Sequence, residues 1–517
     1  MKKIFTLILI LFVASLSACR FGNVTTNQDS TTSQGTTTHQ GTTTNQGSTT
    51  SQDTTTNQGT TTNQGTTTNQ GTTTGSFETP EIPGTLPDST LKFTKKTFSN
   101  CLMLDGPLTT NHLPSVGSPR VLVIPINLND SEATDENLIK IEKTFNGTSS
   151  ETCWESVTTF YQKSSYGKLN LKFEIIKEWY KPSQSLSYYE NYYSEDYYAS
   201  DLIVLEALKH YDSVYDYSEY DYNGDDCIDA VWLVYNCPVD YEGSSELRWA
   251  YCTQYPDDKL LDNKYVNMYG WAGIDFINEA DPVYDNTNII YDAHTFIHET
   301  GHLMGLDDYY DYDDAAGADG GTYWADMMDA NIGDHGAFSK LLLGWVSPTL
   351  VTGTGIGNID LKSFVNTGEF LLLSDHEITS IYDEYFLVEF YTDESLNKND
   401  SPFYGENVIG IKVVHIDARI CYDENGQPAW NGDEAYYTGF LYDNSGTDYL
   451  INHLLRQDYS SSMEEYATSD SLYTPSSKKF GINIWNDYKY HSGSALNFSI
   501  VVNSMNYDSA NITIEIK

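Results

Sequence analysis

Two histidines and a glutamate near the middle of the chain have the types and spacing of a metal-dependent hydrolase. His298 and His302 stand four residues apart, and Glu299 follows the first of them. On a helix this spacing places both imidazoles on one face, where they can bind one Zn²⁺ ion at about 2.0–2.1 Å. Glu299 then lies beside the ion as the general base for a zinc-activated water. The expected chemistry is hydrolysis of a peptide bond.

Asp308 is the predicted third zinc ligand, because a catalytic zinc site normally takes three ligands from the protein. It follows the first histidine by ten residues, the position of the third ligand in the longer zinc motif. Gly305 suits the left-handed turn that ends such a helix. The sequence has no Glu between Glu299 and Glu369, which argues against a Glu ligand from a later helix. Asp307 is the alternative, since it also follows the turn.

Two further histidines lie close to this motif in the sequence. His294 continues the four-residue spacing backward, but three ligands spread over about 12 Å of helix cannot converge on one ion. We therefore predict that His294 packs against the site without binding the metal. His335 is a candidate donor to the transition state.

The chain here resembles the immune inhibitor A family of secreted bacterial metallopeptidases, a metzincin-like group. That family's motif is His-Glu-x-x-His-x-x-Gly-x-x-Asp, which residues 298–308 match. In the family a Trp-Asp-x-Met segment forms the methionine turn under the zinc. Residues 324–329, Trp-Ala-Asp-Met-Met-Asp, are similar with one residue inserted. The resemblance assigns the turn to Met328, with Met327 as the alternative. Metzincins often have a Tyr two residues later, where this chain has Ala330.

Shorter matches extend the resemblance on both sides of the zinc motif. They are Tyr-Gly-Lys-Leu at 166–169, Leu-Gly-Trp at 343–345 and Val-Val-His-Ile-Asp at 413–417. The resemblance covers the chain from about residue 119 onward in patches. It implies a protease that acts on proteins, with zinc at the catalytic site and calcium bound elsewhere.

An acidic segment has the spacing of a calcium loop of the EF-hand type. Asp221, Asn223, Asp225 and Asp229 stand at positions one, three, five and nine of such a loop. Position twelve is Trp232 instead of the usual Glu. The four residues are thus candidate calcium ligands, and the alternative is an acidic surface turn that leads into a strand.

The N-terminus has the features of a bacterial lipoprotein signal. Lys2 and Lys3 precede an apolar run, and Leu-Ser-Ala at 16–18 precedes Cys19. We expect Cys19 to be lipidated and to anchor the mature chain to the outer face of the cytoplasmic membrane. An ordinary secretory signal is the alternative, and both place the protein outside the cytoplasm. The Thr, Asn, Gln and Gly repeat that follows lacks apolar residues for a core, which predicts a disordered tether.

The charge of the chain excludes one class of partner. The sequence has 28 Lys plus Arg against 73 Asp plus Glu, a net charge of −45. Nucleic acid would be repelled, and so would an anionic membrane face, which leaves the lipid as the only membrane contact. Apart from Cys19 there are six cysteines, whose pairing the sequence does not determine.

Helix and strand patterns alternate up to about Trp345, which predicts an α/β domain. The expected strands are 120–128, 169–176 and 231–235, and the expected helices are 155–162 and 201–211. After Pro348 the apolar segments are β-rich and bounded by turn residues. There we expect strands at 384–391, 408–416 and 498–502, and a short helix at 449–456.

These patterns divide the chain into four expected parts. Residues 1–18 are the lipoprotein signal peptide, and residues 19–76 are the lipidated cysteine with its tether. Residues 77–348 are a zinc metallopeptidase domain, which the resemblance makes an α/β (α+β) metzincin-like fold. Residues 349–517 are a mostly β, sandwich-like C-terminal domain.

The function predicted from the sequence is that of an extracellular, lipid-anchored zinc metalloendopeptidase with protein or peptide substrates. The alternative is a surface-binding lipoprotein that keeps a peptidase fold but lacks activity. The presence of Glu299 favours the enzyme, because a binding module has no need of a general base beside the metal.

Overall fold

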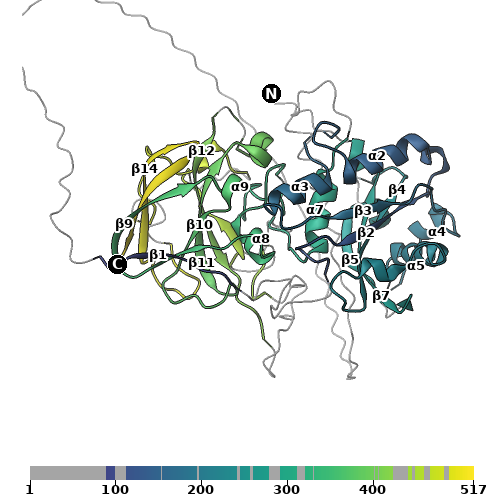
Figure 1. Cartoon of the computed structure of the whole chain (residues 1–517), viewed down its shortest axis with the longest axis horizontal. Helices are drawn as coiled ribbons and strands as arrows, with labels where there is room; N and C mark the ends of the chain where they lie inside the picture. The colour runs from purple at the N-terminus through teal and green to yellow at the C-terminus, as the bar shows by residue number, and fades with distance from the viewer. Residues whose placement is uncertain are drawn as a thin grey trace, which may run out of the picture. The chain divides into compact units, whose positions relative to one another are not determined.

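The computed structural model describes most of the chain beyond residue 88 (Figure 1). The described residues are 89–98, 112–152, 154–194, 197–240, 245–256, 260–278, 291–310, 321–329, 331–400, 402–403, 405, 407–422, 440–444, 449–458, 466–481 and 488–517. The predicted signal peptide, tether and Cys19 lie outside this part of the chain, as do Cys101, Cys153 and Ala330. Among the described residues no helix is both long and apolar enough to cross a membrane.

The fold is a mixed α/β arrangement built on three sheets. In spatial order the strands of the first sheet are β3 (Lys172–Ile175), β2 (Arg120–Ile126), β4 (Cys227–Tyr235), β7 (Lys264–Gly273) and β5 (Tyr251–Gln254). The first four run parallel, whereas β5 and the short β6 (Leu260–Leu261) pair antiparallel with β7. Parallel strands buried on both faces read as continuous apolar runs, which is why β2 and β4 could be predicted from sequence.

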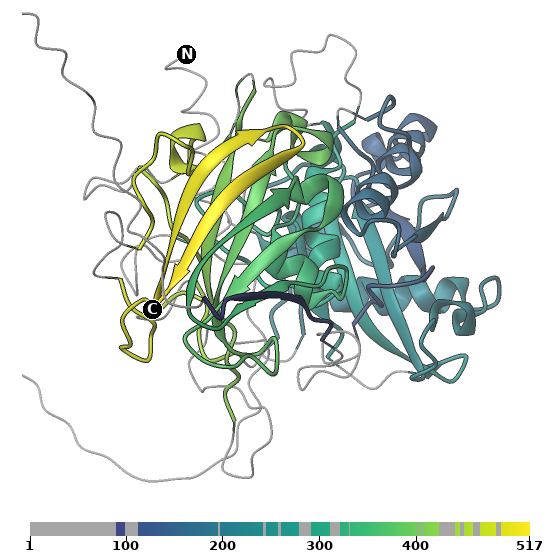
Figure 2. The same ribbon diagram turned by 60° about the vertical axis from the view of Figure 1, so that its left-hand side comes forward.

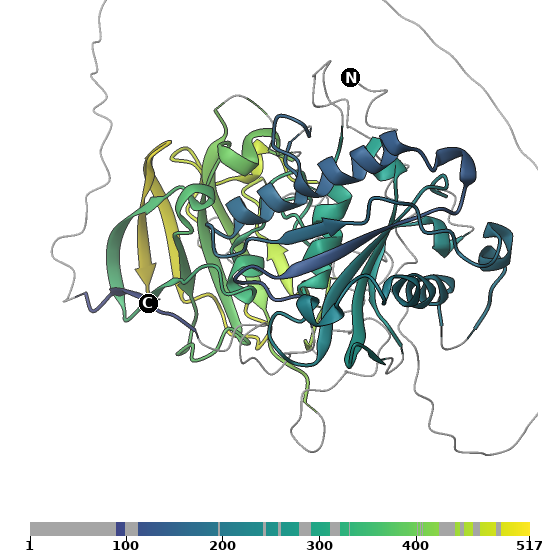
Figure 3. The same ribbon diagram turned by 45° about the vertical axis from the view of Figure 1, so that its right-hand side comes forward.

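Helices cover both faces of this sheet (Figure 3). Apolar residues of α2 (Asp135–Asn146), α3 (Val157–Ser164) and α7 (His294–Leu303) share one buried cluster with Val121 and Val123 of the sheet. On the other face α5 (Ala199–Tyr211) and α4 (Leu186–Glu190) pack with Leu122 and Ile124. Successive residues of a strand point to opposite faces, so β2 anchors helices on both sides. The predicted helices at 155–162 and 201–211 correspond to α3 and α5.

The second half of the chain, together with the early strand β1, forms two facing sheets (Figure 2). The larger has the spatial order β1 (Lys92–Lys95), β8 (Thr349–Thr352), β10 (Phe370–Leu373), β11 (Glu384–Thr392), β12 (Ile409–Asp417) and β13 (Asn452–Leu454). The smaller consists of β14 (Phe498–Asn506), β15 (Ser509–Ile516) and β9 (Gly355–Lys362). Apolar residues from both sheets form a common core. The predicted strands at 384–391, 408–416 and 498–502 are therefore present.

One element differs from the prediction. The segment 449–456, expected to be helical, contains strand β13, which pairs antiparallel with β12. Leu450, Ile451, Leu454 and Leu455 are all buried, so their spacing, which suits a helix, also suits a strand enclosed on both faces. The free edge of β12 offers backbone hydrogen bonds that override the local pattern.

Shorter helices fill the connections between these elements. They are α6 (Asp275–Asn278), α8 (Ala337–Leu342), α9 (Phe364–Thr367), η1 (Asp130–Glu132), η2 (Tyr217–Tyr220), η3 (Glu246–Arg248), η4 (Ser395–Asn399) and η5 (Ser469–Ser471). The described residues belong to one compact unit, and one buried apolar cluster contains Phe338 and Leu343 together with Phe370 and Leu387. The core thus crosses the predicted boundary at residue 348.

Candidate metal centre

Helix α7 presents the two histidines of the zinc motif on one face. His298 Nε2 and His302 Nε2 lie 3.2 Å apart. Tyr161, from α3, supports the helix from behind, because its hydroxyl donates a hydrogen bond to the Ile297 carbonyl (2.6 Å). The helix ends directly after the second histidine, where Gly305 adopts φ +89° and the Leu306 N–H bonds the Gly301 carbonyl (3.1 Å). This left-handed turn is the one that the glycine predicts.

The reversal after Gly305 brings Asp308 to the two histidines. Its Oδ1 lies 2.9 Å from His298 Nε2 and 3.2 Å from His302 Nε2. Three ligand atoms about 3.3 Å apart are what a tetrahedral ion with bonds of about 2.0 Å requires. Asp307, the alternative ligand, is not in this group. The structure therefore brings together His298, His302 and Asp308.

Hydrogen bonds at the far side of each ring fix its orientation. His298 Nδ1 donates to the Met327 carbonyl, and His302 Nδ1 donates to the Leu306 carbonyl, both at 2.8 Å. With a proton on each Nδ1, Nε2 is the ring atom that faces Asp308 and can bind a metal once its own proton has left. The donor set and its outer hydrogen bonds thus fit Zn²⁺.

Burial and mutual attraction shift the pKa values in this group. Burial lowers the pKa of His302, but the Asp308 carboxylate outweighs it and raises the pKa to about 10. The pKa of His298 is also raised, with Asp308 overcoming burial. Burial works to raise the pKa of Asp308, yet the two histidines hold it well below its usual range. The cluster thus attracts protons, which a divalent cation can replace.

Glu299 sits on the same helix, 8 % exposed. Burial raises its pKa, against the opposing effect of His302 and His298. A carboxylate with a raised pKa is a better proton acceptor near neutral pH. The site also stays accessible, because the side chains of His298 and His302 keep 12 % and 16 % of their surface exposed.

Met328 packs directly beneath the zinc-motif helix. A Cβ added to Gly301 would lie 2.5 Å from Met328 Sδ, so a larger residue at that position of α7 would force the Met328 side chain to move. The Met328 carbonyl accepts the N–H of Tyr309 (2.7 Å), which fixes the chain beside Asp308. Met328 thus lies under α7, whereas Met327 contributes the carbonyl that orients His298.

The neighbouring histidines have different surroundings from the two ligands. Burial lowers the pKa of His294 to about 4, with His298 as a second cause, and His294 is not in the metal-binding group. His335 is 1 % exposed and lies against the rings of Phe160 and Tyr161. This enclosure argues against a direct contact between His335 and a substrate.

One aromatic residue beside the site was missed in the sequence. The ring of Tyr310 stacks on that of His298, with centroids 6.4 Å apart and planes 25° from parallel. The signal was its position two residues after Asp308, which puts its side chain on the same side of an extended chain.

The predicted calcium ligands gather in a tight loop between η2 and β4. Asp221, Asp225 and Asp229 each offer an oxygen within 4.8 Å of the others. The oxygen of Asn223 is turned to the N–H of Asp225 (3.1 Å). Asp229 is 1 % exposed, and its Oδ1 accepts no hydrogen bond from the described residues. Burial, then Asp225 and Asp221, raise its pKa to about 8.

A lysine already partly neutralises this loop. Lys264 Nζ lies 2.7 Å from Asp221 Oδ2 and 2.8 Å from Asp226 Oδ1. The buried carboxylate of Asp229 is left without a cation at hydrogen-bond distance among the described residues. This is the position at which a bound Ca²⁺ would relieve repulsion.

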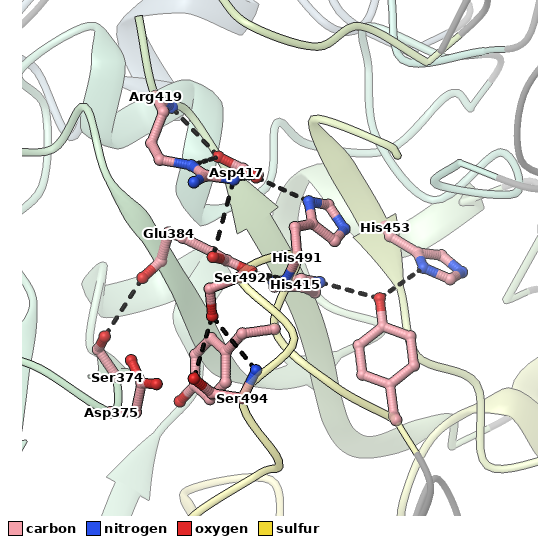
Figure 4. Close-up of polar contacts among 12 residues, drawn as sticks. Ser374, Asp375, Glu384, His415, Asp417, Arg419, His453, His491, Ser492 and Ser494 are labelled. Atoms are coloured by element: carbon pink, nitrogen blue, oxygen red, sulfur yellow. Dashed lines mark hydrogen bonds and ion pairs between the residues drawn. The ribbon is translucent and has the colours of Figure 1, made fainter. Parts of the chain in front are cut away.

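A further group of metal-binding residue types lies in the C-terminal sheet (Figure 4). Glu384, Asp417 and His491 each offer an atom within 4.8 Å of the others. Arg419, however, donates from Nε and Nη2 to the two carboxylate oxygens of Asp417, at 2.7 and 2.6 Å. His491 Nδ1 also lies 2.7 Å from Asp417. These residues thus form a closed ion network that already includes a cation.

Two neutral histidines extend the network away from Arg419 (Figure 4). The hydroxyl of Tyr488 lies 2.9 Å from His415 Nδ1 and 3.1 Å from His453 Nδ1. His415 Nε2 lies 3.1 Å from Glu384 Oε1. Burial lowers the pKa of both histidines, that of His453 to about 3. The network therefore ties the segment around Tyr488 to the sheet.

The described cysteines contain no disulfide. These cysteines are Cys227, Cys237, Cys252 and Cys421. Burial raises the pKa of Cys227 to about 11 and that of Cys237 to about 12, so these two thiols are poor nucleophiles at neutral pH.

Comparisons with known proteins identify no family. A scan against protein-family models finds no match, and a search of curated proteins finds none either.

Proposed function

We propose that the protein is an extracellular zinc metalloendopeptidase with a metzincin-like catalytic domain. The observation that supports this most strongly is the convergence of His298 Nε2, His302 Nε2 and Asp308 Oδ1 within 3.2 Å of one another. Glu299 stands beside them on the same helix. The three ligand residues provide a metal site, and Glu299 provides a base next to it. The site is partly exposed to solvent.

Each residue has a distinct task in the proposed reaction. His298, His302 and Asp308 hold the ion, which when bound supplies a Lewis acid that activates water and polarises the peptide carbonyl. Glu299 accepts the proton of the attacking water through its carboxylate. The same carboxyl group then delivers that proton to the nitrogen of the leaving amine. Met328 fills the space under the helix and keeps the histidines in register.

Proteolysis that depends on the metal tests this proposal. The purified protein should hydrolyse casein, lose that activity when a chelator removes zinc, and regain it when zinc is restored. The contrary result is a zinc-loaded protein that leaves casein intact. That result would favour the alternative, a surface-binding lipoprotein without activity.

The calcium loop provides a second test, through stability. Selective removal of Ca²⁺ should lower the melting temperature and speed autolysis, because a ligand that binds only the folded state stabilises it. Asp229→Asn removes the buried charge, and that variant should melt at the same temperature with and without Ca²⁺. If the parent's melting curve is insensitive to Ca²⁺ and metal analysis finds only zinc, the loop is an acidic turn.

We also propose that Cys19 anchors the protein by its lipid. The sequence places Cys19 after Leu-Ser-Ala and before the Thr-rich repeat. Cys19→Ala should move the protein from the membrane fraction to the soluble extracellular fraction. The variant lacks the lipid, and so acidic a chain is not attracted to an anionic membrane surface. Retention of the variant in membranes would contradict lipidation at this residue.

A further inference from the structure

The loop that contains the methionine turn controls the orientation of a zinc ligand. Its Met327 carbonyl accepts the hydrogen bond from His298 Nδ1 (2.8 Å). Its Met328 side chain packs against Gly301 of α7, where an added Cβ would lie 2.5 Å from Sδ. A shift of this loop would therefore change both the direction of the His298 ring and the seat of the helix.

An ion pair in the C-terminal sheet holds both ends of this loop. Glu389 on β11 and Lys412 on β12 are direct partners across the two strands, with Nζ and Oε2 3.4 Å apart. Glu389 Oε1 accepts the N–H of Ala337 (2.8 Å), after the loop. Lys412 Nζ donates to the carbonyl of Ala325 (3.3 Å), before the loop. Both side chains are buried, that of Glu389 at 3 % and that of Lys412 at 7 % exposed.

Between these two ends the Asp326 carboxylate bridges two backbone positions of the loop. Asp326 Oδ1 accepts the N–H of Met328 (3.0 Å), and its Oδ2 accepts the N–H of Gly336 (2.8 Å). A Cβ added to Gly336 would lie 2.7 Å from Asp326 Oδ2 and 3.3 Å from Lys412 Nζ. Gly336 thus lies close against Asp326, and the two hydrogen bonds of this carboxylate connect the end of the loop at Gly336 to Met328.

Stability alone does not account for this pair. Replacing a buried ion pair by apolar side chains of similar volume is often neutral or stabilising. The specific contribution of Glu389 and Lys412 is a charge-assisted hydrogen bond to each end of the loop, which fixes the loop's position. Outer hydrogen bonds of this kind orient metal ligands and commonly change metal affinity by about 10–100-fold.

We propose that Glu389 and Lys412 are positioning residues for the zinc site. They act through the loop between Ala325 and Ala337 on His298 and on helix α7. The inference rests on the proposed function, because it assigns to the C-terminal sheet a part in holding the zinc. It also means that the C-terminal sheet helps to position the ligands of the zinc site.

The double substitution Glu389→Gln with Lys412→Met tests the inference. It removes one positive and one negative charge together, so the net charge of the buried cluster is unchanged, and both new side chains are close in size to the old ones. We expect zinc affinity, measured by competition with a chelator, to fall by about 10–100-fold. The absorption spectrum of the Co²⁺-substituted protein should change, because it reports the geometry of the ligands. The melting temperature of the metal-free protein should stay close to that of the parent.

A matched control and a conservative substitution complete the experiment. Lys479 and Glu515 form a partly exposed ion pair (2.6 Å) in the same half of the chain, away from the loop. Lys479→Met with Glu515→Gln should leave zinc affinity and the Co²⁺ spectrum unchanged. Lys412→Arg, which keeps a donor and a charge, should bind zinc more tightly than Lys412→Met.

The possible outcomes separate this inference from the proposed function. A parent protein that binds no zinc at the motif refutes the proposed function and this inference with it. A parent that binds zinc, with a double variant of equal affinity and unchanged Co²⁺ spectrum, refutes the positioning role alone. A double variant that cannot fold without metal also refutes it, because the pair would then serve the fold.

Discussion

Glu299→Gln should bind zinc as the parent does and lose nearly all proteolytic activity. The glutamine has the same size but cannot accept a proton, and loss of a general base typically costs about 10²–10⁴-fold in rate. Zinc should remain because Glu299 does not belong to the group formed by His298, His302 and Asp308. The measurements are the rate of casein hydrolysis and the zinc content of the purified variant.

The matched control for this substitution is Glu377→Gln. Glu377 is exposed on the loop between β10 and β11, so the same chemical change there should leave the rate unaltered. A Glu299→Gln variant that hydrolyses casein at the parent's rate would exclude Glu299 as the base. A variant that has lost its zinc would instead show that the residue helps to hold the metal.

Asp308→Ala should weaken zinc binding by more than about 100-fold, since even an outer hydrogen-bond partner is commonly worth 10–100-fold. The substitution removes one of three ligand atoms and the negative charge that lies 2.9 Å from His298 Nε2. The two remaining imidazoles are too few for a stable catalytic site. Metal analysis after dialysis against a weak chelator measures the loss.

Asp307→Ala is the control that the chain itself offers. It removes the same side chain one residue earlier, from a position outside the metal-binding group, and should leave zinc content unchanged. Full zinc in the Asp308 variant would disprove its role as a ligand. Loss of zinc only in the Asp307 variant would move the assignment to that residue.

Local features of the sequence were sufficient to predict the centre of the site. The four-residue spacing of His298 and His302 predicted a helix, and Gly305 predicted the turn that returns Asp308 to them. Each of these contacts spans at most ten residues, so local geometry determines them. The buried strands β2 and β4 were predicted for the same reason, because each is a continuous apolar run.

Features that depend on distant contacts were not predicted. Strand β13 pairs with β12 across a long segment, and its apolar residues match two periodicities. Glu389 and Lys412 contact a loop that precedes them by 52 and 87 residues. One signal was present, because each is a charged residue directly flanked by apolar residues of its strand, and such a residue is buried only with a partner. The sequence did not identify that partner.

The pairing of β1 with β8 has a consequence for how the chain is made and folded. Lys92 lies opposite Thr352, so two neighbouring strands of one sheet enclose the whole segment that bears the zinc motif. In topological terms that segment is an insertion between adjacent strands of a β domain. During synthesis β1 is made long before β8, so the two strands cannot pair until the intervening segment has been synthesised. The entropy cost of closing so large a loop rises only with the logarithm of its length, so the delay affects the rate of folding more than the final stability.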